Sequence, residues 1–254
     1  MPGNTHSNNA TDFIFASLLT GVYDVNRNEV LEKDNFATIQ KWYDSIVKLK
    51  LNAIVFHNAF SKEIIKKYAN DYVQFIEVAY DEKLNPNVFR YFIYQDFIRQ
   101  YSQQINHLFI TDITDVEVIN DPFESSIFIE NSDCLFCGDE PKLLDNEWMQ
   151  AHNDHLRNSM PEFSIYEALN KNKPLLNCGV IGANITVMKL LLDKMVDMHK
   201  AYSSTNKTAY TLDMGVFNYI ARTVFADKIL HGKPVNTVFK KYESERADCW
   251  FRHK

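Results

Sequence analysis

A short apolar run that leads directly into two carboxylates is the part of this sequence best suited to chemistry. Leu108, Phe109 and Ile110 are followed by Asp112, and Asp115 comes three residues after it. A charged group at the end of a buried strand is costly to remove from water unless it has a partner. Ligands of open α/β sheets bind outside the carboxyl ends of the strands, and Mg²⁺ and Mn²⁺ prefer oxygen ligands. The pair therefore indicates a divalent cation that holds a diphosphate, although aspartates in a plain capping turn after a strand give the same pattern.

The elements expected to position these carboxylates alternate along the first half of the chain. The pattern of apolar residues predicts strands at 13–19, 51–56, 73–78 and 108–111, and helices at 36–49 and 62–68. A further helix begins at Asn85-Pro86, where a side-chain cap precedes a proline in the first turn. Strands that alternate with helices are typical of a mostly parallel sheet with crossover helices. The predicted fold class is therefore α/β.

The second half of the chain has a less regular pattern. It predicts short strands at 127–129, 134–137 and 175–181, a polar helix-prone connection at 145–173, and helices at about 187–198 and 213–224. The last residues, 233–254, are rich in basic and aromatic side chains. Residues 1–11 predict a disordered lead-in, so that a single domain covers 12–254.

Composition and charge exclude several classes of function. With 27 basic and 33 acidic residues the formal net charge is −6, which argues against a nucleic acid as the main partner. No apolar run reaches about 18 residues, so no transmembrane segment is expected, and the polar start does not resemble a signal peptide. The four cysteines are too scattered for a disulfide framework, and Cys134 and Cys137 lack a second pair at zinc-finger spacing. A reducing, cytoplasmic location is therefore expected.

Several segments carry a resemblance to a known family. The acidic segment, with its TD-x-x-DV…DPF pattern over 111–123, resembles the acidic motif of GT-A-fold nucleotide-sugar glycosyltransferases, especially a bacterial and viral group. Three further segments resemble parts of that family: NCGVIG at 177–182, near the acceptor; LDMGVFN at 212–218, a helix start beside the donor sugar; and GKPV at 232–235 with the RHK ending at 252–254, which closes over the diphosphate. The resemblance spans 13–254. The usual motif is D-x-D, so this chain has an extra residue between its carboxylates, and Met214 stands where glutamine is common.

The resemblance implies a GT-A fold and a metal-dependent transfer of a sugar from a nucleotide diphosphate, UDP by default, to a glycan or other hydroxyl acceptor. It implies a nucleotide-binding half at about 12–123 and an acceptor half with a closing tail at about 124–254. The implied residues are Asp112 and Asp115 for Mn²⁺ or Mg²⁺, with His253 first and His231 second as a further ligand; Thr20, Arg90, Asp112, Lys233 and Lys254 for the nucleotide; and Asp213 and Asn177 for catalysis.

The role of Asp213 depends on the resemblance. The D-x-x-x-x-N pattern that begins there suggests a retaining enzyme, in which this carboxylate would stabilise the transition state beside the sugar. In an inverting enzyme the same carboxylate could be the general base. Without the resemblance, Asp213 is a first-turn acid of the kind that the helix dipole favours.

Two other functions remain open on the sequence alone. A sugar-phosphate nucleotidyltransferase shares the fold and the need for a metal, but it should carry a glycine-rich phosphate loop after the first strand, where this chain has only Gly21. A non-catalytic module that binds a sugar nucleotide or a carbohydrate would keep the fold without the reaction. The sequence indicates no oligomeric state.

Overall fold

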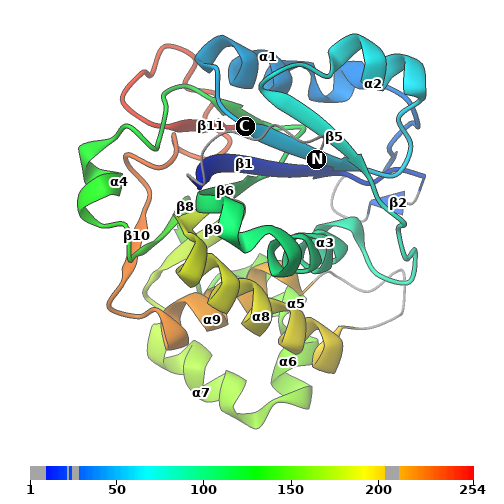
Figure 1. Cartoon of the computed structure of the whole chain (residues 1–254). Helices are drawn as coiled ribbons and strands as arrows, with labels where there is room; N and C mark the ends of the chain where they lie inside the picture. Colours follow the sequence, from blue (N-terminus) through cyan, green and yellow to red (C-terminus); the bar gives the residue numbers. More distant parts are fainter. Residues whose placement is uncertain (1–9, 22, 25–28, 204–211) are drawn as a thin grey trace.

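A seven-stranded sheet with helices on both faces forms the centre of the molecule (Figure 1). The computed structural model describes residues 10–21, 23–24, 29–203 and 212–254. The strands of the sheet are β1 (Thr11–Leu18), β4 (Ala53–His57), β5 (Val73–Glu77), β6 (Ile105–Thr111), β8 (Leu135–Leu143), β9 (Pro174–Asn184) and β10 (Ile229–His231). Their order is β10-β8-β9-β6-β1-β4-β5, and β9 runs antiparallel to both of its neighbours while the other neighbouring pairs are parallel. The predicted α/β class with a mainly parallel mixed sheet is confirmed.

Two layers of helices cover the sheet (Figure 1). One face carries α1 (Gln40–Leu49), α2 (Lys62–Tyr68) and the short α4 (Ser126–Glu130), and the other carries α3 (Pro86–Tyr101), α5 (Glu147–His152), α6 (Asp154–Ser159), α7 (Pro161–Asn170), α8 (Ile185–Tyr202) and α9 (Asp213–Val224). Alternate side chains of a strand point to opposite faces, so each face has its own core. Phe15 of β1 belongs to the core with Tyr94 of α3, whereas its neighbour Ile14 belongs to the core with Trp42 of α1.

The first half of the chain folds as its pattern predicts. The four predicted strands are β1, β4, β5 and β6, and the predicted helices are α1, preceded by a 3₁₀ turn at Phe36–Ile39, α2 and α3. Asn85 caps α3 by accepting a hydrogen bond from the N–H of Asn87. Because β1, β4, β5 and β6 are parallel, their carboxyl ends share one edge of the sheet, and Asp112 follows β6 at that edge.

One predicted strand of the second half is wrong. The segment 127–129 belongs to helix α4. Phe128 points inward and packs against Phe109 and Phe136, with ring centroids 5.4 Å and 4.9 Å away, while the isoleucines on either side of it are exposed. The apolar run is therefore one helical turn with a single buried anchor, and its β-branched residues do not lie in a sheet.

The other second-half elements are found, with longer strands than predicted. The strand expected at 134–137 continues as β8 to Leu143, and the strand expected at 175–181 continues as β9 to Asn184. Both strands are long because they pair with each other in an antiparallel ladder that reaches Leu143, opposite Pro174. The helix-prone connection contains α5, α6 and α7, and the two predicted helices are α8 and α9.

The end of the chain forms a small second sheet that the sequence did not predict. Strand β11 (Phe251–His253) pairs antiparallel with β7 (Val116–Val118). The short strands β2 (Tyr23–Asp24) and β3 (Glu29–Val30) pair separately. Phe251 of β11 packs against Phe109 of β6, with ring centroids 5.1 Å apart, so the last residues of the chain meet the acidic segment.

Two remaining expectations concern the chain end and the membrane. Of the predicted lead-in, residues 1–9 lie outside the described residues, and Thr11 already belongs to β1, where it pairs with Ile105. In the described part of the chain, no helix combines the length and the apolar character needed to cross a bilayer.

Candidate metal centre

Asp112 and Asp115 lie where β6 ends, at the carboxyl edge of the sheet. The N–H of Asp112 donates to the carbonyl of Gly179 in β9 at 2.7 Å, which ties this aspartate to the neighbouring strand. Asp115 directly precedes β7, and its carbonyl accepts a hydrogen bond from the N–H of Lys254 at 2.9 Å. The pairing of β7 with β11 holds His253 opposite the first residue of β7. Two distant parts of the chain therefore meet at the aspartates.

The three side chains present their ligand atoms to a common point. Ligand atoms of Asp112, Asp115 and His253 all lie within 4.8 Å of one another. Nε2 of His253 is 3.8 Å from Oδ2 of Asp112 and 4.0 Å from Oδ2 of Asp115. These separations are too long for hydrogen bonds, but they suit ligands that each stand about 2 Å from one cation. The group can therefore hold a divalent cation.

His253 has the environment of a metal ligand. Its side chain is only 2% exposed, and Nδ1 has no hydrogen-bond partner among the described residues. Burial lowers the pKa of this imidazole and outweighs the opposing effect of Asp112, so the neutral form is favoured. Neutral imidazole is the form that binds a cation. A buried neutral imidazole that faces two carboxylates thus fits the role of a ligand to a divalent cation.

Arg90 orients the first aspartate. It projects from α3, is buried, and forms an ion pair with Oδ1 of Asp112, while its Nη2 donates to the hydroxyl of Tyr91 at 3.1 Å and to the carbonyl of Cys178 at 3.2 Å. Burial acts to lower the pKa of Arg90, but Tyr91 and Asp112 raise it overall, so the guanidinium stays charged. The two oxygens of Asp112 are thereby separated: Oδ1 faces Arg90, and Oδ2 faces His253.

Gly179 makes room for the cluster. A Cβ at this position would stand 2.3 Å from Cε1 of His253 and 2.8 Å from Oδ2 of Asp112. Its N–H donates to Oδ1 of Asn177 at 2.7 Å, and Nδ2 of Asn177 donates to Oε1 of Glu140 at 2.9 Å. The middle of β9 therefore forms one wall of the site, and Asn177 connects this wall to Glu140 of β8.

Asp213 lies in the buried layer behind this wall. It is the first residue of α9 and is 5% exposed. Its Oδ2 is 3.5 Å from Sγ of Cys178, and Sδ of Met214 is 3.3 Å from the same sulfur. Burial and the charge of Asp213 raise the pKa of the Cys178 thiol. Asp213 is linked to the site through Cys178 and Arg90, and it is not one of the three grouped ligands.

Thr20 and Lys254 are held by contacts outside the three-ligand group. The N–H of Thr20, after β1, donates to Oδ1 of Asn58 at 2.9 Å, and Nδ2 of Asn58 donates back to the Thr20 carbonyl at the same distance. Nζ of Lys254 is 3.9 Å from Glu117, and burial together with Lys41 lowers its pKa. Lys254 is thus a half-buried cation next to Asp115.

The structure does not bring His231 and Lys233 to the three ligands. Nδ1 of His231 is 2.9 Å from Oδ2 of Asp139, and Lys233 forms an ion pair with Asp248. Between the two candidate histidines, the geometry therefore favours His253.

Two adjoining hollows open at the aspartates. One, of about 620 Å³, is lined by Val30, Leu31, Glu32, Asn35, Thr38, Thr114, Asp115, Tyr242 and Lys254. A second, of about 40 Å³, is lined by residues after β1, at the start of α3 and after β6, among them Arg90 and Asp112. Both include Leu31 and Thr114. A ligand held by a cation at the aspartates has space to extend along the larger hollow.

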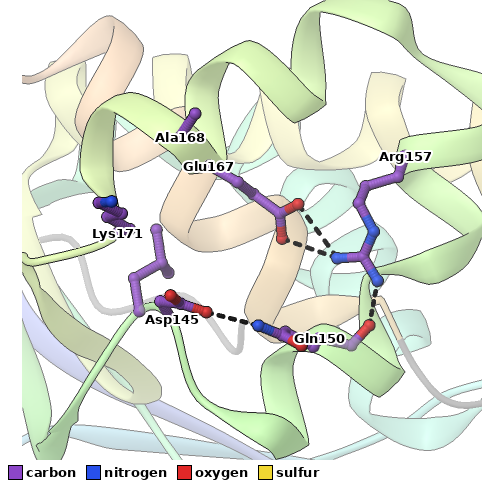
Figure 2. Close-up of a pocket in the computed structure, with 7 residues that line it drawn as sticks. Asp145, Gln150, Arg157, Glu167, Ala168 and Lys171 are labelled. Carbon is purple, nitrogen blue, oxygen red and sulfur yellow. Dashed lines mark hydrogen bonds and ion pairs between the residues drawn. The ribbon is translucent and has the colours of Figure 1, made fainter.

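A third hollow has a different character. It has a volume of about 370 Å³ and lies among α5, α6 and α7 (Figure 2). Figure 2 shows its charged groups bonded to one another: Nη1 of Arg157 is 3.1 Å and 3.0 Å from the two oxygens of Glu167, and Nε2 of Gln150 donates to Asp145 at 2.6 Å. These side chains already satisfy each other, so this hollow holds a structural network.

Sequence reasoning missed two residues of the site. Nothing near Glu140 in the sequence distinguishes it from an ordinary strand-end acid. Lys41, which lies close enough to Lys254 to lower its pKa, stands in the predicted helix 36–49, where a lysine gives no sign of a site. Both become visible through contacts between segments far apart in the chain.

The sequence matches no protein-family model, and no curated protein matches it.

Proposed function

We propose that this chain is a metal-dependent glycosyltransferase of the GT-A type, which moves a sugar from a nucleoside-diphosphate donor to a hydroxyl acceptor. The observation that carries the proposal is the convergence of Asp112, Asp115 and His253 at the carboxyl edge of a mainly parallel sheet, beside a hollow of about 620 Å³. That edge is where such sheets bind ligands. The resemblance of the acidic segment to nucleotide-sugar glycosyltransferases supports the same function.

Mn²⁺ or Mg²⁺ is the proposed cation. Two carboxylates and one imidazole leave coordination positions for the phosphate oxygens of a ligand, because these ions take about six ligands. When bound, the ion would supply the Lewis acid that stabilises charge on the departing diphosphate.

The chain's own groups would hold the donor and the metal ligands in place. Arg90 fixes the carboxylate of Asp112 by its ion pair. Lys254 adds positive charge along the wall of the larger hollow, where the diphosphate of UDP is proposed to lie. Asn177, held by Gly179 and Glu140, is proposed to face the sugar.

Calorimetric titration tests the proposal. UDP and GDP are titrated into the protein with and without Mn²⁺, and the hydrolysis of a panel of UDP-sugars is followed in parallel. We expect nucleotide binding that depends on Mn²⁺ and slow hydrolysis of at least one donor. Metal-dependent nucleotide binding without turnover would instead indicate a non-catalytic binding module. Nucleotide binding of equal affinity with and without Mn²⁺ would contradict the proposal.

Two histidine variants provide a matched pair. His253→Gln should abolish the Mn²⁺ dependence, because it removes a ligand. His231→Gln should leave it unchanged, because that imidazole is bonded to Asp139 outside the group. Equal effects of the two variants would remove His253 from the metal centre.

A further inference from the structure

Glu140 stands next to the site without belonging to the metal ligands. It lies near the end of β8, at the same edge of the sheet as the aspartates, and its side chain is 10% exposed. Asn177 donates to its Oε1 at 2.9 Å, while Oε2 is 4.0 Å from Nζ of Lys142, beyond hydrogen-bond distance. One oxygen of this carboxylate is therefore held by the side chain of Asn177.

A short chain of contacts joins Glu140 to the cluster. Oδ1 of Asn177 accepts from the N–H of Gly179, and Gly179 lies directly against the ring of His253 and the carboxylate of Asp112. Glu140 also acts electrostatically on His253, where it is among the groups that raise the imidazole pKa against burial. Glu140 is thus joined to the metal-ligand group through Asn177 and Gly179.

A separate hollow opens at Glu140. It has a volume of about 400 Å³ and is lined by Asp139, Glu140, Pro141, Lys142, Leu143, Pro174 and Val238. None of these residues lines the two hollows at the aspartates. Its wall mixes prolines and aliphatic side chains with charged groups. Such a surface suits a sugar, because one face of the ring is apolar while its hydroxyls need hydrogen-bond partners.

Other candidates for a proton acceptor fit less well. Asp213 is buried against Cys178, and it lines none of the hollows described above. Asp139 lines the same hollow as Glu140, but its Oδ2 is 2.9 Å from Nδ1 of His231. Met214, where the related enzymes commonly have glutamine, offers only a thioether.

We propose that the acceptor is a sugar whose attacking hydroxyl enters through this hollow, and that Glu140 is the general base that removes its proton. The inference rests on the proposed function. The hydroxyl proton passes to the Glu140 carboxylate as the acceptor oxygen bonds to the anomeric carbon of the donor. The bond from that carbon to the diphosphate oxygen breaks, and its electron pair leaves with the nucleoside diphosphate. Attack from the side opposite the leaving group inverts the anomeric configuration, in contrast to the retention that the D-x-x-x-x-N pattern suggests.

The test uses water and azide as acceptors, so it does not depend on knowing the natural one. The donor is the UDP-sugar that the wild-type protein hydrolyses fastest with Mn²⁺. Glu140→Gln should lower hydrolysis about 100-fold, while its binding of UDP with Mn²⁺ stays within about twofold of wild type. Azide carries no proton to lose, so its rate of glycosyl azide formation should be nearly the same in Glu140→Gln and wild type.

Controls separate the possible outcomes. Glu63→Gln, in helix α2 and outside every hollow described, should hydrolyse the donor like wild type, and Glu140→Asp should keep part of the rate. Nuclear magnetic resonance should first detect the sugar product with the inverted anomeric configuration. Undiminished hydrolysis by Glu140→Gln, an equal loss with water and azide, or a retained anomer would overturn the role of Glu140 and leave the proposed function standing. Wild-type protein that turns over no donor would overturn the proposed function, and this inference with it.

Discussion

The candidate metal centre and the helical hollow of Figure 2 both contain carboxylates and basic groups, yet they are built differently. In the helical hollow, acids and bases from residues 144–171 are bonded to one another, as Arg157 is to Glu167. In the metal centre, Nε2 of His253 stands 3.8 Å and 4.0 Å from two carboxylate oxygens, too far for hydrogen bonds. The first arrangement is complete without a ligand, and the second has space for a cation.

The two regions therefore differ in how their charged groups are paired. Charges that neutralise one another over short sequence separations stabilise local structure. In the candidate metal centre, the carboxylates at one sheet edge meet a neutral imidazole from the far end of the chain. Arg90 stabilises the charge of Asp112 through their ion pair.

The largest effect should come from removing both carboxylates. Asp112→Asn combined with Asp115→Asn should weaken Mn²⁺ binding about 100-fold or more, because even partners of metal ligands change affinity by about 10- to 100-fold. Calorimetry with Mn²⁺ measures the effect. The matched control is Asp145→Asn with Glu167→Gln in the helical hollow, which should leave Mn²⁺ affinity unchanged. A similar loss of Mn²⁺ affinity in both double variants would contradict a metal site at Asp112 and Asp115.

A smaller loss is expected from a methyl group at the wall of the site. Gly179→Ala places a Cβ 2.3 Å from the His253 ring, so the imidazole or the strand must shift. We expect Mn²⁺ affinity to fall about tenfold. In Gly138→Ala the nearest atom would be 3.4 Å away, at Asn236, and this variant should bind like wild type. Full Mn²⁺ affinity in Gly179→Ala would show that the close approach is unimportant.

A substitution in the helical hollow should lower the stability of the protein and leave its Mn²⁺ affinity unchanged. Glu167→Gln weakens the paired contact with Arg157 and one to Asn153, which is buried. The free energy of unfolding should fall by about 1–2 kcal/mol, as measured by urea denaturation, with no change in Mn²⁺ affinity. A variant as stable as wild type would mean that the network contributes nothing.

The smallest effect concerns pH. Burial lowers the pKa of His199, on α8 close to Asp213, from 6.5 to about 4. Between these values the unfolded chain binds a proton that the folded chain does not, so stability is lost as pH falls through this window. His199→Gln should therefore lose less stability than wild type between pH 7.5 and pH 5, by urea denaturation at both values. Equal losses would contradict a buried neutral imidazole.

Much of the fold could be predicted from the sequence, because it depends on local patterns of residues. The spacing of apolar residues placed α1, α2, α3, α8 and α9, and the alternation of strands and helices gave the mainly parallel sheet. The cap at Asn85 fixed the start of α3. The strand predicted at 127–129 is wrong because three apolar residues are too few to show a periodicity. The segment is helical, and only Phe128 is buried in the core.

The position of Asp112 and Asp115 after a buried strand is predictable from the residues alone, since a short apolar run ending in acids is a local pattern. That His253 joins them and His231 does not follows from the fold, because it depends on the antiparallel pairing of β7 with β11 across more than a hundred residues. The same holds for Arg90 and Glu140. Long-range strand pairing and packing leave no periodic trace in the residues they bring together, so contacts of this kind become visible only in the folded chain.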